Sequence, residues 1–141
     1  MVYLTMPKDS KPKFKPAKKS AAAPDYETRK GDYSFKGHVW IEGREGTFLG
    51  YGRVVLLERI KQYGSISVAA RSMSMSYRHA WELVYSMNSQ SRVPLVETTT
   101  GGKGGGGARL TEAGEKAIEF YHGFNKRFKE FLNQEPASFP F

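Results

Sequence analysis

Two short helical patterns lie almost next to each other in the middle of the chain. Ser65 precedes "ISVAARSM" and Ser76 precedes "YRHAWELVYSMN", and each serine hydroxyl is placed to cap the helix that follows it. The stretch "SMS" between the two patterns is long enough only for a turn. Two helices joined by so tight a turn pack against each other, and this pattern predicts a helix-turn-helix motif.

The second of these helices has two faces of different chemistry. By helical spacing, its inward face consists of Ala80, Trp81, Val84 and Met87. Its outward face consists of Arg78, His79, Glu82, Tyr85 and Ser86. A helix fits the major groove of DNA because its diameter matches the width of the groove. We therefore expect the outward residues near the start of this helix to reach base edges, and the helix N-terminus to suit a phosphate.

A run of glycine follows, in which six of the seven residues from Gly101 to Gly107 are glycine and the seventh is Lys103. Residues 95–99 have strand composition, and residues 108–110 can form a return strand. The run is therefore predicted to be the tip of a hairpin, which in a winged helix-turn-helix is the wing. Backbone without side chains can approach phosphates or a minor groove closely, with Lys103 supplying a charge.

The glycine run also matches other patterns less well. "GKGGGG" fits the dinucleotide fingerprint at Gly102, Gly104 and Gly107, but that motif requires a strand, a helix and a second strand in succession. A phosphate-binding P-loop would need glycine where Glu97 stands and a hydroxyl residue after Lys103. A flexible linker is the alternative that stays open.

The segments on both sides of the motif complete the predicted fold class. "HVWIEGREGTFLG" alternates and turns like a hairpin, and "YGRVVLLERIKQYG" has helical spacing up to Gly64. Thr111 caps a last, long helix, whose Glu112 and Glu115 suit its positive end. The expected fold is mainly α with a small β component: a winged helix-turn-helix with an N-terminal β-hairpin and a long C-terminal dimerisation helix.

Large apolar side chains recur along the last helix at alternating spacings of four and three residues. They are Ala117, Tyr121, Phe124, Phe128 and Phe131. This spacing is a short heptad seam, so we expect these residues to form the interface of a homodimer. The alternative is that the stripe packs on the N-terminal hairpin of the same chain.

The charge of the chain favours a polyanionic partner. The formal net charge is +8 and the isoelectric point is about 9.7. Residues 1–30 carry eight Lys or Arg against three Asp or Glu, and residues 1–32 are predicted to be a disordered basic tail. Such a tail either solubilises the protein or adds non-specific affinity for DNA. Residues 33–135 are predicted to form the domain, and residues 136–141 a C-terminal tail.

Several classes of function are excluded by residue types. The chain has no cysteine, and His38, His79 and His122 are scattered, so neither a metal site nor a cofactor is expected. No nucleophile-elbow motif is present, and we do not expect an enzyme. No apolar run reaches the roughly 20 residues that span a bilayer, and the N-terminus lacks the features of a signal peptide. A cytoplasmic protein without membrane contact is the resulting expectation.

The blocks "GSISVAA", "SYRHAW" and "PLVETTTGGKGGGGARLT" occur in this order. With them, residues 57–114 closely resemble the DNA-binding domain of the ModE-type molybdate regulators, in a stand-alone form. The resemblance implies a LysR-like winged helix-turn-helix that regulates transcription by binding double-stranded DNA, as a dimer on an inverted-repeat operator. The candidate DNA-binding residues are Ser65, Ser67, Ser76, Tyr77, Arg78, His79, Glu82, Thr100, Gly101, Gly102 and Lys103.

Two expectations limit this resemblance. Family members continue into small β-barrel domains that bind molybdate, whereas this chain ends at Phe141, so molybdate binding is not expected within it. The alternative function is a protein-interaction module built on a degenerate winged helix. Arg78, His79 and Lys103 together form a basic recognition face, which favours DNA.

Overall fold

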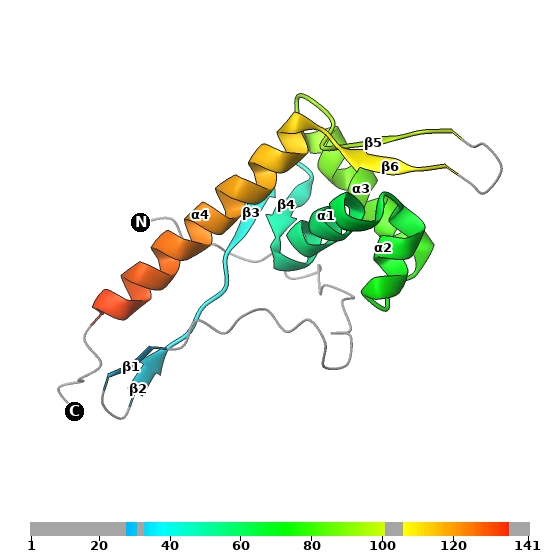
Figure 1. Ribbon diagram of the computed structural model, residues 1–141. Helices are drawn as coiled ribbons and strands as arrows, with labels where there is room; N and C mark the ends of the chain where they lie inside the picture. Colours follow the sequence, from blue (N-terminus) through cyan, green and yellow to red (C-terminus); the bar gives the residue numbers. More distant parts are fainter. Residues whose placement is uncertain (1–27, 31–32, 101–105, 136–141) are drawn as a thin grey trace.

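The computed structural model describes residues 28–30, 33–100 and 106–135. Its elements are β1 (Thr28–Lys30), β2 (Tyr33–Phe35), β3 (Trp40–Gly43), β4 (Gly46–Gly50), α1 (Tyr51–Tyr63), α2 (Ile66–Ser72), α3 (Tyr77–Gln90), β5 (Val96–Thr98), β6 (Ala108–Leu110) and α4 (Glu112–Gln134). The described strands pair as three separate antiparallel hairpins, so the body of the fold is helical. Figure 1 shows α1, α2 and α3 clustered together, the β5–β6 hairpin projecting beyond them, and α4 running away from the cluster. The predicted α+β class with a winged helix-turn-helix layout is confirmed.

Helix α1 is the centre of the core, because α2, β4, β6 and α4 all contact it. Val54, Leu56, Leu57 and Ile60 have no exposed surface. These residues lie on more than one side of the helix, as expected for a helix with neighbours all round. Gly64 ends α1 in the left-handed conformation, with φ of 63°, as its position after the helical pattern predicts.

The helix-turn-helix forms as its local signals predict. The backbone N–H of Val68 donates to Ser65 Oγ at 3.2 Å, and the N–H of His79 donates to Ser76 Oγ at 3.1 Å. Ser74, in the turn between α2 and α3, has a positive φ of 52°. Both predicted caps and the tight turn are therefore confirmed.

Small residues bring α2 and α3 together. Ala69, Ala70 and Ala80 are at most 1% exposed, and their size lets the two helices approach closely. Trp81, which helical spacing assigned to the inward face of α3, is instead at the surface and 37% exposed. Val68 on α2 is likewise 39% exposed. Helical spacing places Trp81 at the margin of the apolar stripe, and it lies beyond the edge of the packed helices.

The wing is the β5–β6 hairpin, whose register pairs Val96 with Leu110 and Thr98 with Ala108. The N–H of Ala108 donates to the carbonyl oxygen of Gly64 at 2.9 Å, which fastens the wing to the turn between α1 and α2. The predicted hairpin is confirmed. Its glycine-rich tip, residues 101–105, lies outside the described residues.

The N-terminal hairpin is also confirmed, with Gly43 opposite Gly46 at its turn. Gly46 has a φ of 98°, which favours glycine. Residues 28–30 form β1 and pair with β2, so this part of the predicted disordered tail (1–32) is a strand. Residues 1–27 and 136–141 lie outside the described residues.

Helix α4 begins at the predicted cap, since the N–H of Gly114 donates to Thr111 Oγ1 at 3.1 Å. The predicted dimer seam requires correction, because part of it faces the same chain. Tyr121 is 1% exposed and its hydroxyl donates to the carbonyl oxygen of Val39 at 2.8 Å. The ring of Phe128 packs over Gly37, where an added Cβ would lie 2.7 Å from it. The alternative of packing within the same chain is thus correct for Tyr121 and Phe128, although they contact the segment just before the N-terminal hairpin and not the hairpin itself.

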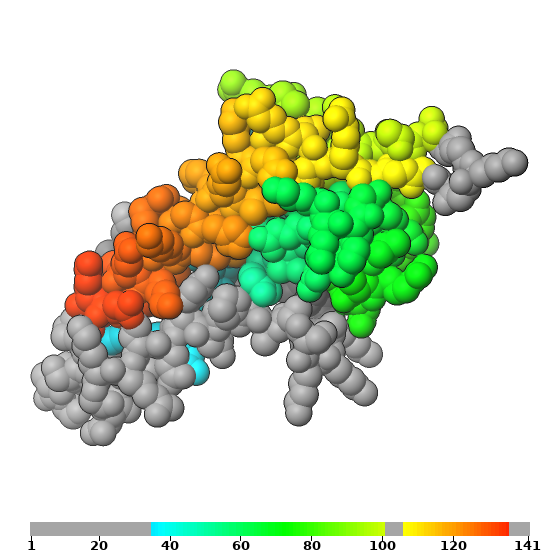
Figure 2. All heavy atoms as spheres, viewed as in Figure 1, coloured from blue at the N-terminus to red at the C-terminus, as the bar shows by residue number. Residues whose placement is uncertain are grey.

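The other residues of the predicted seam divide between the core and the surface. Ala117 is partly buried against the core. Phe124 and Phe131 are 40% and 54% exposed, and Phe120, which the seam did not include, is 57% exposed. Figure 2 shows α4 as a ridge that extends well beyond the block formed by α1 and α2.

Candidate nucleic-acid interface

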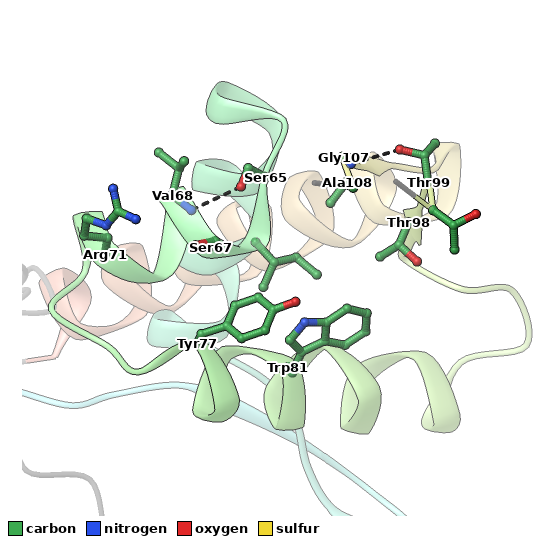
Figure 3. A pocket seen from close by; sticks show the side chains of 13 residues that line it. Ser65, Ser67, Val68, Arg71, Tyr77, Trp81, Thr98, Thr99, Gly107 and Ala108 are labelled. Atoms are coloured by element: carbon green, nitrogen blue, oxygen red, sulfur yellow. Dashed lines mark hydrogen bonds between the residues drawn. The ribbon is translucent and has the colours of Figure 1, made fainter. Parts of the chain in front are cut away.

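A cleft of about 630 Å³ lies between α2, α3 and the wing. Its lining residues are Ser65, Ile66, Ser67, Val68 and Arg71 from α2 and its cap, Tyr77 and Trp81 from α3, and Thr98, Thr99, Thr100, Gly106, Gly107 and Ala108 from the wing. Figure 3 shows α3 along one side of the cleft, with α2 and the wing facing each other across it. The cleft is thus formed by the three elements that the sequence singled out for DNA contact.

Two aromatic rings stand on the α3 side of the cleft. Tyr77 and Trp81 are one helical turn apart, and their ring centroids lie 6.2 Å apart with the planes nearly perpendicular. Both side chains point into the cleft (Figure 3), and Tyr77 is 54% exposed. Their apolar faces are therefore presented to whatever enters the cleft.

Hydroxyl groups and one guanidinium complete the lining. Ser65, Ser67, Thr98 and Thr99 contribute hydroxyls, and Arg71 is the only charged residue among the described residues that line the cleft. With no carboxylate in this lining, the electrostatic preference is for an anion. Hydroxyls, backbone N–H groups and arginine are the groups that proteins use to hold phosphates.

The outer strip of α3, defined here as Arg78, Glu82 and Tyr85, faces solvent beside the cleft. The Arg78 side chain is 90% exposed, and its Nε donates to Glu82 Oε1 at 3.0 Å. Such an exposed ion pair contributes little to stability. Because the contact uses Nε, the two terminal nitrogens of Arg78 keep their fork geometry for a bidentate acceptor. His79 Nδ1 is 3.8 Å from the same carboxylate.

Asn88 links α3 to the base of the wing. Its Oδ1 accepts from the N–H groups of Leu95 at 2.8 Å and Val96 at 3.2 Å, and its Nδ2 donates to the Val96 carbonyl at 2.9 Å. These three hydrogen bonds fix the wing relative to α3. The sequence analysis did not identify this role. A polar asparagine on the same side of α3 as Tyr77 and Trp81 could have indicated a hydrogen-bonded contact with the wing.

The predicted DNA-binding residues differ in where they lie. Ser65, Ser67, Tyr77 and Thr100 line the cleft, while Arg78, His79 and Glu82 lie outside it on α3 and Ser76 caps that helix. Gly101, Gly102 and Lys103 lie outside the described residues. The sequence analysis missed Arg71, Trp81, Thr98 and Thr99 as cleft residues. It assigned Tyr85, which is 73% exposed, to the outward face of α3 but did not count it among the DNA-binding residues.

A second arginine supports α3 from the other side. The half-buried Arg53 at the start of α1 donates to Ser86 Oγ at 2.9 Å. Burial lowers the pKa of Arg53, but a guanidinium remains protonated at neutral pH.

In the part of the chain that the structure describes, no helix is both long and apolar enough to cross a bilayer. The same residues contain no cluster of three or more His, Asp or Glu suited to a metal ion.

The region that contains these features is similar to a known family and to several known proteins. Residues 52–115 match the family described as bacterial regulatory helix-turn-helix protein, lysR family. The chain is 44% identical over 101 residues to the molybdenum-pterin-binding protein MopB of Rhodobacter capsulatus, covering 67% of this chain and 37% of MopB. Over 69 residues it is 49% identical to the transcriptional regulator ModE of Yersinia pestis, covering 49% of this chain and 26% of that protein.

The DNA-binding transcriptional dual regulator ModE of Escherichia coli is 48% identical over 69 residues, which cover 49% of this chain and 26% of ModE. The chain thus spans well under half the length of these relatives.

Proposed function

Since residues 52–115 match the helix-turn-helix family of LysR regulators and are similar to part of the ModE regulators, we propose that this protein is a transcription regulator that binds double-stranded DNA. The observation that carries the proposal is the arrangement of α3. Its outer strip is exposed along the helix, and the hydrogen bonds of Asn88 hold the wing beside it. This is the arrangement in which a helix enters the major groove and a flanking hairpin contacts the backbone.

Individual roles follow from position and chemistry. Arg78 reads guanine, because its exposed terminal nitrogens match the O6 and N7 acceptors. Glu82 holds the guanidinium of Arg78 and is itself able to accept from the amino group of cytosine. His79 lies next to this pair, and Lys103, with Gly101 and Gly102, supplies the wing contact to the phosphates.

The proposal includes a homodimer formed through α4. Phe120, Phe124 and Phe131, named here the exposed aromatic face, lie on one side of the helix, with the first two rings stacked at 6.4 Å. Contiguous exposed apolar surface of this kind marks an interface. A second copy of the chain covers it, and two copies related by a two-fold axis read an inverted repeat. Sedimentation at micromolar concentration should give a dimer, and a monomer that still binds its site tightly would contradict this model.

Selection of bound fragments from random duplexes tests the function as a whole. The selected fragments should contain an inverted repeat, and affinity should fall steeply with salt because phosphate contacts release counterions. Absence of binding to any duplex at low salt would favour a protein-interaction module instead.

Two variants then test the recognition helix against the wing. Arg78→Ala should lose about 1–3 kcal/mol of discrimination between the selected site and random DNA. Lys103→Ala should weaken both by a similar factor and reduce the salt slope. Equal losses on specific and random DNA for both variants would mean that α3 does not read bases.

A further inference from the structure

Two of the five methionines lie in the turn between α2 and α3, where the proposed function gives them no role. Met73 and Met75 are half-buried and pack against the hydrophobic core. Met87, the third methionine in the described part of the chain, has no exposed surface. A small solute can therefore reach the side chains of Met73 and Met75 but not that of Met87.

Met75 closes this turn. Its N–H donates to the carbonyl oxygen of Ala70 at 2.9 Å, and the N–H of Ser74 donates to that of Arg71 at 3.1 Å. Ser74 is left-handed, with φ of 52°. These two hydrogen bonds around a left-handed residue form a Schellman motif, in which the following residue commonly packs an apolar side chain on the end of the helix. Met75 occupies that position, and its side chain packs on the core in which Ala70 is buried.

The packing of Met75 matters because the turn is strained. The left-handed position of this motif usually holds glycine, and Ser74 has a Cβ that disfavours the conformation. The turn is therefore maintained by its two hydrogen bonds and by the apolar contact of Met75. Ser76, the next residue, caps α3, so the turn also determines where Tyr77 and Arg78 are placed.

The thioether of methionine is the only oxidisable sulfur group in the chain, because the chain has no cysteine. Its sulfur attacks one oxygen of hydrogen peroxide, so that an S–O bond forms as the O–O bond breaks. The departing hydroxide takes the proton of the transferred oxygen and leaves as water, and the sulfur has lost two electrons to the peroxide. The product, methionine sulfoxide, is polar, and sulfoxide reductases return it to methionine. A polar oxygen in an apolar contact costs free energy unless it is hydrogen-bonded.

We propose that Met75 is an oxidation site through which peroxide weakens DNA binding. In the reduced chain, its side chain packs on the core and holds the turn closed. In the sulfoxide, the polar oxygen draws the side chain out toward water, the strained turn opens, and α3 loses its fixed position relative to α2. Reduction restores the contact. The effect on DNA rests on the proposed function, whereas the oxidation of Met75 and the loosening of the turn do not.

Peptide mapping after treatment of the full chain with hydrogen peroxide tests the site. Trypsin releases residues 72–78, which contain Met73 and Met75, separately from residues 79–92, which contain Met87. Fragmentation should locate added oxygen on Met75, and the Met87 peptide should stay unmodified while the chain is folded. Duplex affinity should fall about tenfold, as expected for a polar group in an apolar contact, and methionine sulfoxide reductases should restore it. Oxidation of Met87 as fast as Met75 would contradict the site.

Variants at position 75 separate the sulfur from the packing. Met75→Leu keeps an apolar side chain of similar size, so it should bind DNA as before and lose most of the response to peroxide. Met73→Leu, at the half-buried neighbour, is the matched control and should keep the full response. Met75→Gln places a polar group there without oxidation and should bind about tenfold more weakly than the untreated chain. An equal response to peroxide in Met75→Leu and the unmodified chain would overturn the proposal.

The outcomes separate this inference from the function on which it rests. Failure of the untreated chain to bind any duplex would remove the proposed function. Thermal unfolding then still tests the turn: peroxide should lower the midpoint of the unmodified chain but not that of Met75→Leu, and equal shifts would refute the inference. Site-specific binding that persists when Met75 is fully oxidised would keep the proposed function and refute the switch.

Discussion

The two faces of α4 carry similar apolar side chains but have different environments. The internal face, defined as Gly114, Ile118, Tyr121, Asn125 and Leu132, is buried against the same chain. The exposed aromatic face, formed by Phe120, Phe124 and Phe131, has 40% or more of each side chain at the surface. Figure 1 shows that α4 lies along the helical cluster at its start and extends past it, beside the segment that leads into β3, toward its end.

A heptad pattern therefore does not distinguish packing within a chain from packing between chains. Both are satisfied by large apolar residues at spacings of three and four. The internal face contributes to the free energy of unfolding, whereas in the proposed dimer the exposed aromatic face contributes to association. Substitutions on the two faces should therefore affect different measurements.

Phe124→Asp should have the largest effect, because it places a charge at the centre of the exposed aromatic face. A central aromatic contact is worth about 2 kcal/mol or more, and the two-fold axis brings the change in twice, so the dimer dissociation constant should rise roughly a thousandfold. Analytical ultracentrifugation measures this, and circular dichroism should remain that of a folded protein.

Lys126→Asp is the control for that prediction, since Lys126 is exposed on a different side of the same helix. It should leave the dimer intact. If Phe124→Asp and Lys126→Asp dissociate the dimer equally, net charge controls association and the aromatic face does not. The proposed difference between the two faces would then be wrong.

Gly114→Ala tests the internal face by overpacking. A Cβ at this position would overlap the carbonyl oxygen of Leu95, at the junction of the wing and α4. Relief of such an overlap shifts backbone and costs about 1–3 kcal/mol of the free energy of unfolding, measured by denaturant titration.

Gly123→Ala is the matched control in the same helix, because its Cβ would meet only the Arg127 side chain, at 3.7 Å. It should raise stability by about 0.5–1 kcal/mol through helix propensity. Losses of equal size from both alanines would show that position 114 has no special packing.

Asn125→Leu should stabilise the protein. Asn125 is 5% exposed, and within the described residues its Oδ1 has no hydrogen-bond partner. A leucine of similar volume removes the unsatisfied acceptor, so the free energy of unfolding should rise by about 1–2 kcal/mol with no change in dimer affinity. A change in dimer affinity without a change in stability would place Asn125 at the interface between copies.

Tyr121→Phe should have the smallest effect. It removes only the hydroxyl that donates to the Val39 carbonyl, a hydrogen bond of 2.8 Å between residues 82 positions apart. The expected loss is about 1 kcal/mol of the free energy of unfolding, with the sedimentation coefficient unchanged. Dissociation of the dimer by this substitution would show that Tyr121 is part of the dimer interface, as the sequence predicted.

Elements whose signals are local were predictable from the sequence. The caps at Ser65, Ser76 and Thr111 and the stop at Gly64 depend only on residues within one turn, and each is where the pattern indicates. Part of the candidate site follows for the same reason, since Tyr77 and Arg78 take their directions from the helix that Ser76 begins.

The rest of the site and both faces of α4 depend on contacts between segments distant in sequence. Whether Trp81 is buried depends on how closely α2 and the wing approach it across the cleft. The link between α3 and the wing depends on Asn88 meeting the backbone of Leu95 and Val96. Periodicity indicates which residues share a side of a helix. Whether that side is buried depends on the segment that packs against it. For Tyr121 that neighbour is Val39, brought to α4 by the fold of the intervening chain, and no local pattern contains that information.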